Sequence, residues 1–161
     1  MQKSTSSILN ARFSNASILI AGLLNSYAIA LLFYTGFYYL FTHEFTRYHA
    51  AAIQTEWQAL PENLQFLILI FLKALGTGAL VCGLAMSVML TYVAKNKPTD
   101  ERWLIAGTGL VGGLWYGLFA WFTFTVHWET GADSPRFIIL SGLVATLLAA
   151  TLRLSFAKRV A

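Results

Sequence analysis

The chain has 161 residues, a formal net charge of +4, 57% hydrophobic residues and only 11% charged residues. Soluble domains carry about 25% charged residues, so this composition excludes an ordinary water-soluble protein. Cys82 is the only cysteine, which excludes an intrachain disulfide and the dithiol chemistry of disulfide-exchange enzymes.

Most of the hydrophobic residues are gathered in four apolar runs. A helix needs about 20 apolar residues to cross a bilayer, and each run reaches that length. The first run continues well beyond Ala28-Ile29-Ala30, so it is predicted to be a retained helix rather than a cleaved signal peptide. We therefore predict one all-α domain over residues 1–161, an integral membrane four-helix bundle. The predicted spans cover residues 16–41, 64–93, 103–126 and 137–156.

The ends of the runs carry local helix signals. Pro61 and Ser134-Pro135 stand before the second and fourth runs, where Ser134 is a good N-cap and proline fits the first turn. Gly131 suits a turn after the third run.

The basic residues flank the runs unevenly and therefore indicate an orientation. One side of the predicted bundle carries seven lysines and arginines, with Arg153 nearby, whereas the other side carries only Arg47 and Arg136. Basic loops face the cytoplasm, so both termini and the 95–102 loop are expected there. This arrangement also explains the net charge without a nucleic-acid partner. The seven residues are Lys3, Arg12, Lys95, Lys97, Arg102, Lys158 and Arg159.

The first outer loop is predicted to hold a short amphipathic helix, because residues 42–60 contain neither glycine nor proline. At 100° per residue, His49 and Glu56 share the otherwise apolar face of such a helix. They would lie about 10.5 Å apart along the axis, too far to bond each other. Each would need another partner, and the second outer loop offers His127, Glu129 and Asp133.

All three histidines and five of the seven acids are predicted to lie on this outer side. Imidazoles and carboxylates that converge there could bind a transition metal or act as general acid and base. A haem held by His43 and His127 is a narrower version of this hypothesis. Alternatively, these two histidines interact with free carbonyls at helix ends. The candidate residues are His49, His127, Glu56, Glu129, His43 and Asp133.

Lys73 is the only charge within the middle part of a predicted span. An ionisable residue in a membrane helix is a candidate functional residue by default. It could snorkel to the outer interface, pair with Glu56 or Glu129, or form the centre of a transport site.

Small residues four positions apart occur in every run and predict close helix contacts. The predicted contact stripes are Gly22, Ser26 and Ala30; Ala79, Gly83 and Ser87; Gly109, Gly113 and Gly117; and Gly142, Thr146 and Ala150.

Several motifs resemble a family of small four-helix membrane proteins of bacteria that has no assigned activity. The resemblance rests on Tyr48-His49-Ala50, on the segment from Trp57 to Gly78, and on Thr130-Gly131-Ala132-Asp133-Ser134-Pro135. Within the middle segment it involves Trp57, Leu60, Gln65, Lys73, Gly76 and Gly78. It implies a four-helix architecture in the bacterial inner membrane and identifies no catalytic residue.

The sequence therefore favours a multi-pass inner-membrane protein that acts by binding within the bilayer. Its partners would be lipids and either other membrane subunits or further copies of itself. The alternative is a metal- or haem-dependent membrane enzyme whose His and carboxylate site faces the periplasm. A third hypothesis is a small transporter that uses Lys73.

Overall fold

The computed structural model describes residues 5–95 and 102–160, and these residues are almost entirely helical. No strand occurs in these two ranges, so the all-α prediction is confirmed. The helices are α1 (Thr5–Phe41), α2 (Arg47–Ile53), the short 3-10 helix η1 (Trp57–Ala59), α3 (Glu62–Lys95), α4 (Arg102–Thr130) and α5 (Arg136–Val160).

Four of these helices are long and apolar enough to cross a membrane, which indicates a multi-pass membrane protein. They correspond to the four predicted spans. Their apolar segments are Ala16–Phe41, Glu62–Lys95, Leu104–Thr130 and Arg136–Ser155.

The predicted end signals act as expected at Pro61, Pro135 and Gly131 but not at Ser134. The Pro61 carbonyl accepts bonds from the first amides of α3, and the Pro135 carbonyl does the same for α5. Gly131 follows α4 with a φ of +68°, a conformation that glycine adopts without steric cost. The N-cap prediction for Ser134 is wrong, because its buried hydroxyl oxygen has no hydrogen-bond partner.

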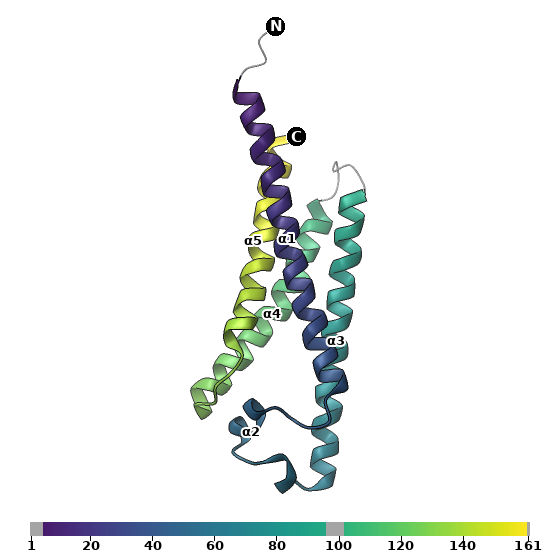
Figure 1. Ribbon diagram of the computed structural model, residues 1–161, viewed down its shortest axis with the longest axis vertical. Helices are drawn as coiled ribbons and strands as arrows, with labels where there is room; N and C mark the ends of the chain where they lie inside the picture. The colour runs from purple at the N-terminus through teal and green to yellow at the C-terminus, as the bar shows by residue number, and fades with distance from the viewer. Residues whose placement is uncertain (1–4, 96–101, 161) are drawn as a thin grey trace.

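The four long helices form one bundle. Figure 1 shows α1 crossing in front of α4, with α5 on one side and α3 on the other. Toward the short helix α2, the α4 and α5 pair leans away from α3, and the segment with α2 and η1 lies at this open end. We call this end of the bundle the α2 end, and the opposite end the Lys95 end.

Small residues allow close backbone contact between α1 and α3. A Cβ added to Gly76 would lie 2.7 Å from the carbonyl oxygen of Gly36 and 2.8 Å from the backbone nitrogen of Leu40. Only glycine fits there without moving a helix, and such close approach is the main source of helix association in lipid. The seam along α3 consists of Leu72, Gly76, Ala79, Gly83 and Met86.

The predicted stripes are partly confirmed. Ala79 and Gly83 are buried as expected, whereas Ser26 and Ala30 are exposed on α1. Helix α1 instead buries a different set of mostly small residues along the bundle axis. This set is Ala21, Asn25, Ala28, Leu32 and Gly36.

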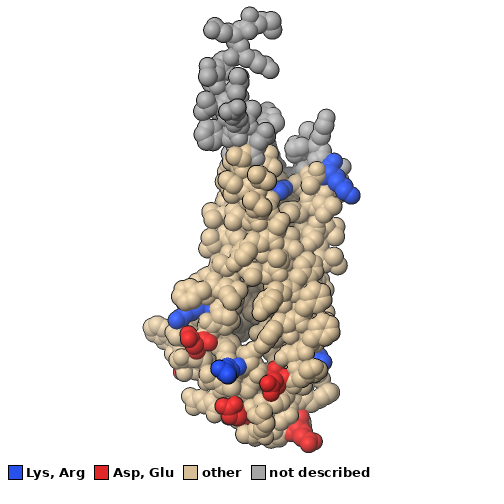
Figure 2. All heavy atoms as spheres, viewed as in Figure 1, with Lys and Arg blue, Asp and Glu red and all other residues tan. Residues whose placement is uncertain are grey.

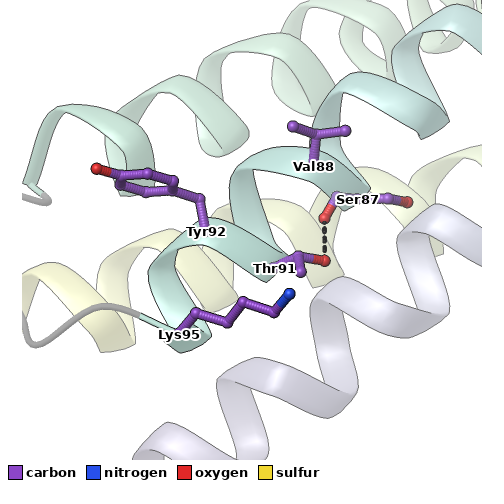
Figure 3. A pocket seen from close by; sticks show the side chains of 5 residues that line it. All are labelled: Ser87, Val88, Thr91, Tyr92 and Lys95. Atoms are coloured by element: carbon purple, nitrogen blue, oxygen red, sulfur yellow. Dashed lines mark hydrogen bonds between the residues drawn. The ribbon is translucent and has the colours of Figure 1, made fainter.

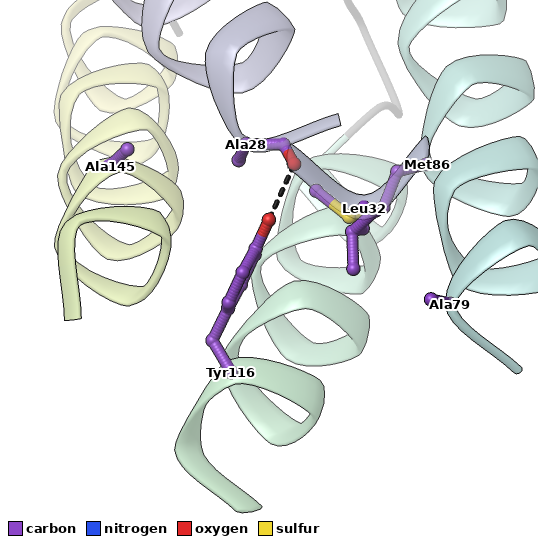
Figure 4. Close-up of a cluster of buried hydrophobic side chains, with 6 residues drawn as sticks. All are labelled: Ala28, Leu32, Ala79, Met86, Tyr116 and Ala145. Carbon is purple, nitrogen blue, oxygen red and sulfur yellow. Dashed lines mark hydrogen bonds between the residues drawn. The ribbon is translucent and has the colours of Figure 1, made fainter. Parts of the chain in front are cut away.

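Tyr116 of α4 connects three helices in the centre of the bundle (Figure 4). Its hydroxyl donates to the backbone carbonyl of Ala28 in α1 at 2.5 Å, and its ring occupies the space left by Gly142 in α5. A second bond, 2.8 Å long, joins the hydroxyls of Tyr27 in α1 and Ser141 in α5.

The α1–α3 contact predicts that Gly76→Ala destabilises the bundle by about 1–3 kcal/mol, because the added methyl overlaps backbone atoms. The free energy of unfolding in detergent measures this loss. Gly117→Ala is the matched control, since a Cβ at Gly117 meets nothing within 4 Å. Equal stability of the two variants would contradict the close contact.

Candidate functional site

The loop between α1 and α3 contains most of the candidate residues, but it is not the continuous helix that was predicted. Helix α2 ends at Ile53, and Gln54 adopts a left-handed conformation with a φ of +53°. The chain then turns into η1. The prediction that His49 and Glu56 share one helix face is therefore wrong.

His49 fixes the start of α2. Its Nδ1 accepts a bond from the backbone N–H of Thr46 at 3.3 Å and lies 2.7 Å from the Thr46 hydroxyl oxygen. Because Nδ1 accepts this bond, the neutral ring carries its proton on Nε2. The arrangement is a capping box in which histidine takes the place of the usual glutamate or glutamine.

Aromatic rings surround His49. Tyr39 at the end of α1 meets the imidazole edge-on, with centroids 6.0 Å apart, and Phe45 and Tyr48 contact it from its own loop. This burial lowers the pKa of His49 below its usual range. The side chain thus joins the loop to α1 as a neutral, structural group.

Trp57 in η1 anchors the second half of the loop. The Gln65 side-chain amide donates to the backbone carbonyls of Trp57 and Leu60, each at 3.0 Å. The Trp57 indole also packs edge-on against Phe45, with ring centroids 5.0 Å apart. These contacts hold η1 against the first turn of α3 and join the second half of the loop to Phe45 in its first half.

His127 has a structural role at the end of α4. Its Nδ1 donates to the carbonyl of Ala132 at 2.9 Å, which holds the 131–135 loop against the helix. The bond is to a loop carbonyl rather than to a free carbonyl of the helix itself. Glu129 and Asp133, the other candidates in this region, are exposed.

The predicted metal site does not form in the structure. Within the described residues, no group of three or more His, Cys, Asp or Glu side chains could hold a metal ion. His43 and Glu56 are exposed, and His49 and His127 each use one ring nitrogen in a structural bond. The haem hypothesis for His43 and His127 gains no support from these positions.

Lys73 lies on the exposed surface of α3, eleven residues after Glu62. This separation corresponds to about 16 Å along the helix axis. A transport site would line the interior of the bundle, whereas Lys73 is on its outer surface. Its exposure fits the snorkelling interpretation better than a buried ion pair.

Two surface hollows were not predicted from the sequence. One has a volume of about 360 Å³ and is lined by residues of α3 near the Lys95 end (Figure 3). The hydroxyls of Ser87 and Thr91 both donate to backbone carbonyls of α3 itself, and Lys95 is the only charged residue among the described ones that line the hollow. The other hollow, of about 670 Å³, is formed by the loop around α2.

Comparisons of this chain with family models, with curated proteins and with solved structures give no match.

The His49 contacts predict that the stability of the loop around α2 depends on pH. Because the folded-state pKa is lowered, the unfolded loop takes up a proton first as the pH falls. The contribution of His49 to stability is therefore complete above about pH 6.5 and decreases as the pH falls below it. Protonated Nδ1 also cannot accept the Thr46 bond.

Hydrogen exchange of residues 46–50, corrected for intrinsic rates, should therefore be faster at pH 5 than at pH 7.5. His49→Gln should remove this difference, and His43→Gln should keep it, since His43 is exposed. A pH effect that survives His49→Gln would refute the assignment.

Proposed function

We propose that this chain is a multi-pass protein of the bacterial inner membrane that acts by binding another membrane helix, supplied by a second copy or by a larger complex. The observation that carries the proposal is the exposure of Ser26 and Ala30 on α1. Both are small residues, and they are four positions apart on one helix face. That spacing is typical of close helix association in lipid.

Two large side chains flank the small pair on the exposed side of α1. Leu23 and Tyr34, which are 64% and 66% exposed, stand one turn before and after the two small residues. These four exposed residues lie along one side of α1, with the two small side chains between the two large ones, and we call them the α1 face. Because α3 and α5 flank α1 on either side, no described helix covers the α1 face (Figure 1).

Exposed leucine or phenylalanine alone would not favour this proposal, because lipid tails cover such side chains equally well. Small residues differ, because they leave part of the helix backbone open to a neighbour. Ser26 and Ala30 were predicted from the sequence to pack inside the bundle, but both are exposed in the structure.

The proposed orientation places both termini and the Lys95 end in the cytoplasm, and the α2 end in the periplasm. The uneven count of lysine and arginine supports it. In Figure 2, charged side chains of both signs gather at the α2 end, and the middle of the visible face carries none. A charge-free middle between two polar ends is what a bilayer requires.

Thiol cross-linking in native membranes tests the proposal in a Cys82→Ser background. Ala30→Cys should give a disulfide-linked dimer on mild oxidation if a second copy binds the α1 face. Leu147→Cys is the matched control and should stay monomeric. Leu147 is also exposed, and it lies as many residues from the start of α5 as Ala30 lies from the end of α1.

Ala30→Leu should abolish the association, because the larger side chain would hold the partner helix away from the α1 backbone. If Ala30→Cys gives no dimer, a larger complex that Ala30→Leu disrupts would assign the α1 face to another subunit. Cross-linking of Leu147→Cys as strong as that of Ala30→Cys, or a monodisperse monomer unaffected by Ala30→Leu, would contradict the proposal.

A further inference from the structure

We propose that the hollow formed by the loop around α2 binds the ammonium–phosphate zwitterion of an ethanolamine lipid headgroup. The hollow has a volume of about 670 Å³, within the range of about 300–1,000 Å³ that small-ligand sites occupy. The residues that carry the argument are Glu44, Phe45, Arg47, Gln54, Glu56 and Trp57, and all of them line the hollow.

The position of the loop favours a lipid over a solute. The loop leaves α1 at Phe41 and enters α3 at Glu62, which are the ends of two membrane-spanning segments. Lipid headgroups occupy this level beside a spanning helix. A hollow there is open to the headgroup layer without any movement of the bundle.

Opposite charges line the hollow without neutralising each other. Glu44, Arg47 and Glu56 are all exposed, and in the described part of the chain no ion pair joins the Arg47 guanidinium to either carboxylate. Two carboxylates and one guanidinium give the hollow a net negative charge, which favours a ligand that carries a cation. The guanidinium presents paired N–H donors that fit a phosphate. A ligand that carries both charges would complement the two kinds of group together.

An ammonium group matches the remaining lining residues. A primary ammonium has three N–H donors, which the carboxylate of Glu56 and the side-chain oxygen of Gln54 could accept. The rings of Phe45 and Trp57 lie beside these groups, and aromatic faces attract cations. An anionic headgroup without an amine could use the guanidinium of Arg47, but it would leave the two carboxylates without a cationic partner.

The aromatic rings and the backbone around the hollow are held in place before any ligand binds. Phe45 is only 6% exposed and packs on Trp57, Gln65 holds the backbone of η1, and the His49 side chain fixes the first turn of α2. A preorganised site loses less conformational entropy on binding than a flexible loop would. These contacts lie apart from the α1 face, so the two proposals can fail independently.

Native mass spectrometry of the full chain in detergent tests the site, with phosphatidylethanolamine and phosphatidylglycerol as probes. We expect one phosphatidylethanolamine to be retained per chain in preference to phosphatidylglycerol. Arg47→Gln and Glu56→Gln should each weaken that binding about tenfold, the effect of losing one charge-assisted contact. Arg136→Gln and Glu62→Gln are the matched controls at the same end, do not line the hollow, and should bind as the unmodified chain does.

Three results would overturn the proposal. The first is equal retention of phosphatidylglycerol, and the second is no difference between the hollow variants and their controls. The third is displacement of the lipid by soluble glycerophosphoethanolamine at equal concentration, which would assign the hollow to a free solute. Loss of cross-linking at Ala30→Cys with lipid binding intact would affect only the proposed helix-binding role.

Discussion

The arrangement of the bundle depends on the bond from the Tyr116 hydroxyl to the Ala28 carbonyl, together with the close approach of α1 and α3. The bond crosses from α4 to α1, while the ring of the same tyrosine fills the space above Gly142 of α5. Lipid tails are as apolar as the helix surfaces, so burial of apolar groups does not drive the helices together. Close backbone approach and a few interhelical hydrogen bonds must do so. Gly36 and Gly76 supply the approach between α1 and α3, and Tyr116 holds α4 to the other side of α1.

The sequence predicted the spans well, because a bilayer fixes the length and polarity of a crossing helix. It predicted the contacts within the bundle less well. In a soluble helix the apolar face identifies the core, but here residues facing lipid and residues facing the bundle are both apolar. Small residues were the remaining signal, and α1 carries two sets of them. Ser26 and Ala30 were predicted to pack inside, but Ala28 and Gly36 do so.

The sequence also predicted the candidate site incompletely, because local patterns did not show where the loop helix ends. The face analysis assumed a regular helix through residues 42–60, and the left-handed Gln54 ends it although no glycine or proline marks the position. The sequence predicted that His49 needs a partner, and in the structure it lies half-buried among three aromatic rings. Its partner is its own capping threonine rather than a metal. The hollow beside it depends on contacts between Trp57, Phe45 and Gln65, which no local pattern predicts.

The two proposed binding surfaces follow from one structure, because the bundle that leaves the α1 face open also supports the loop at its α2 end. That account requires Tyr116 to hold the helices in place. The free energy of unfolding of Tyr116→Phe in detergent tests this most directly, with Tyr27→Phe as comparison. We expect Tyr116→Phe to lose about 1 kcal/mol, typical of a buried interhelical bond in lipid, and Tyr27→Phe to lose less, because Tyr27 is exposed. Unchanged stability of Tyr116→Phe would contradict the account.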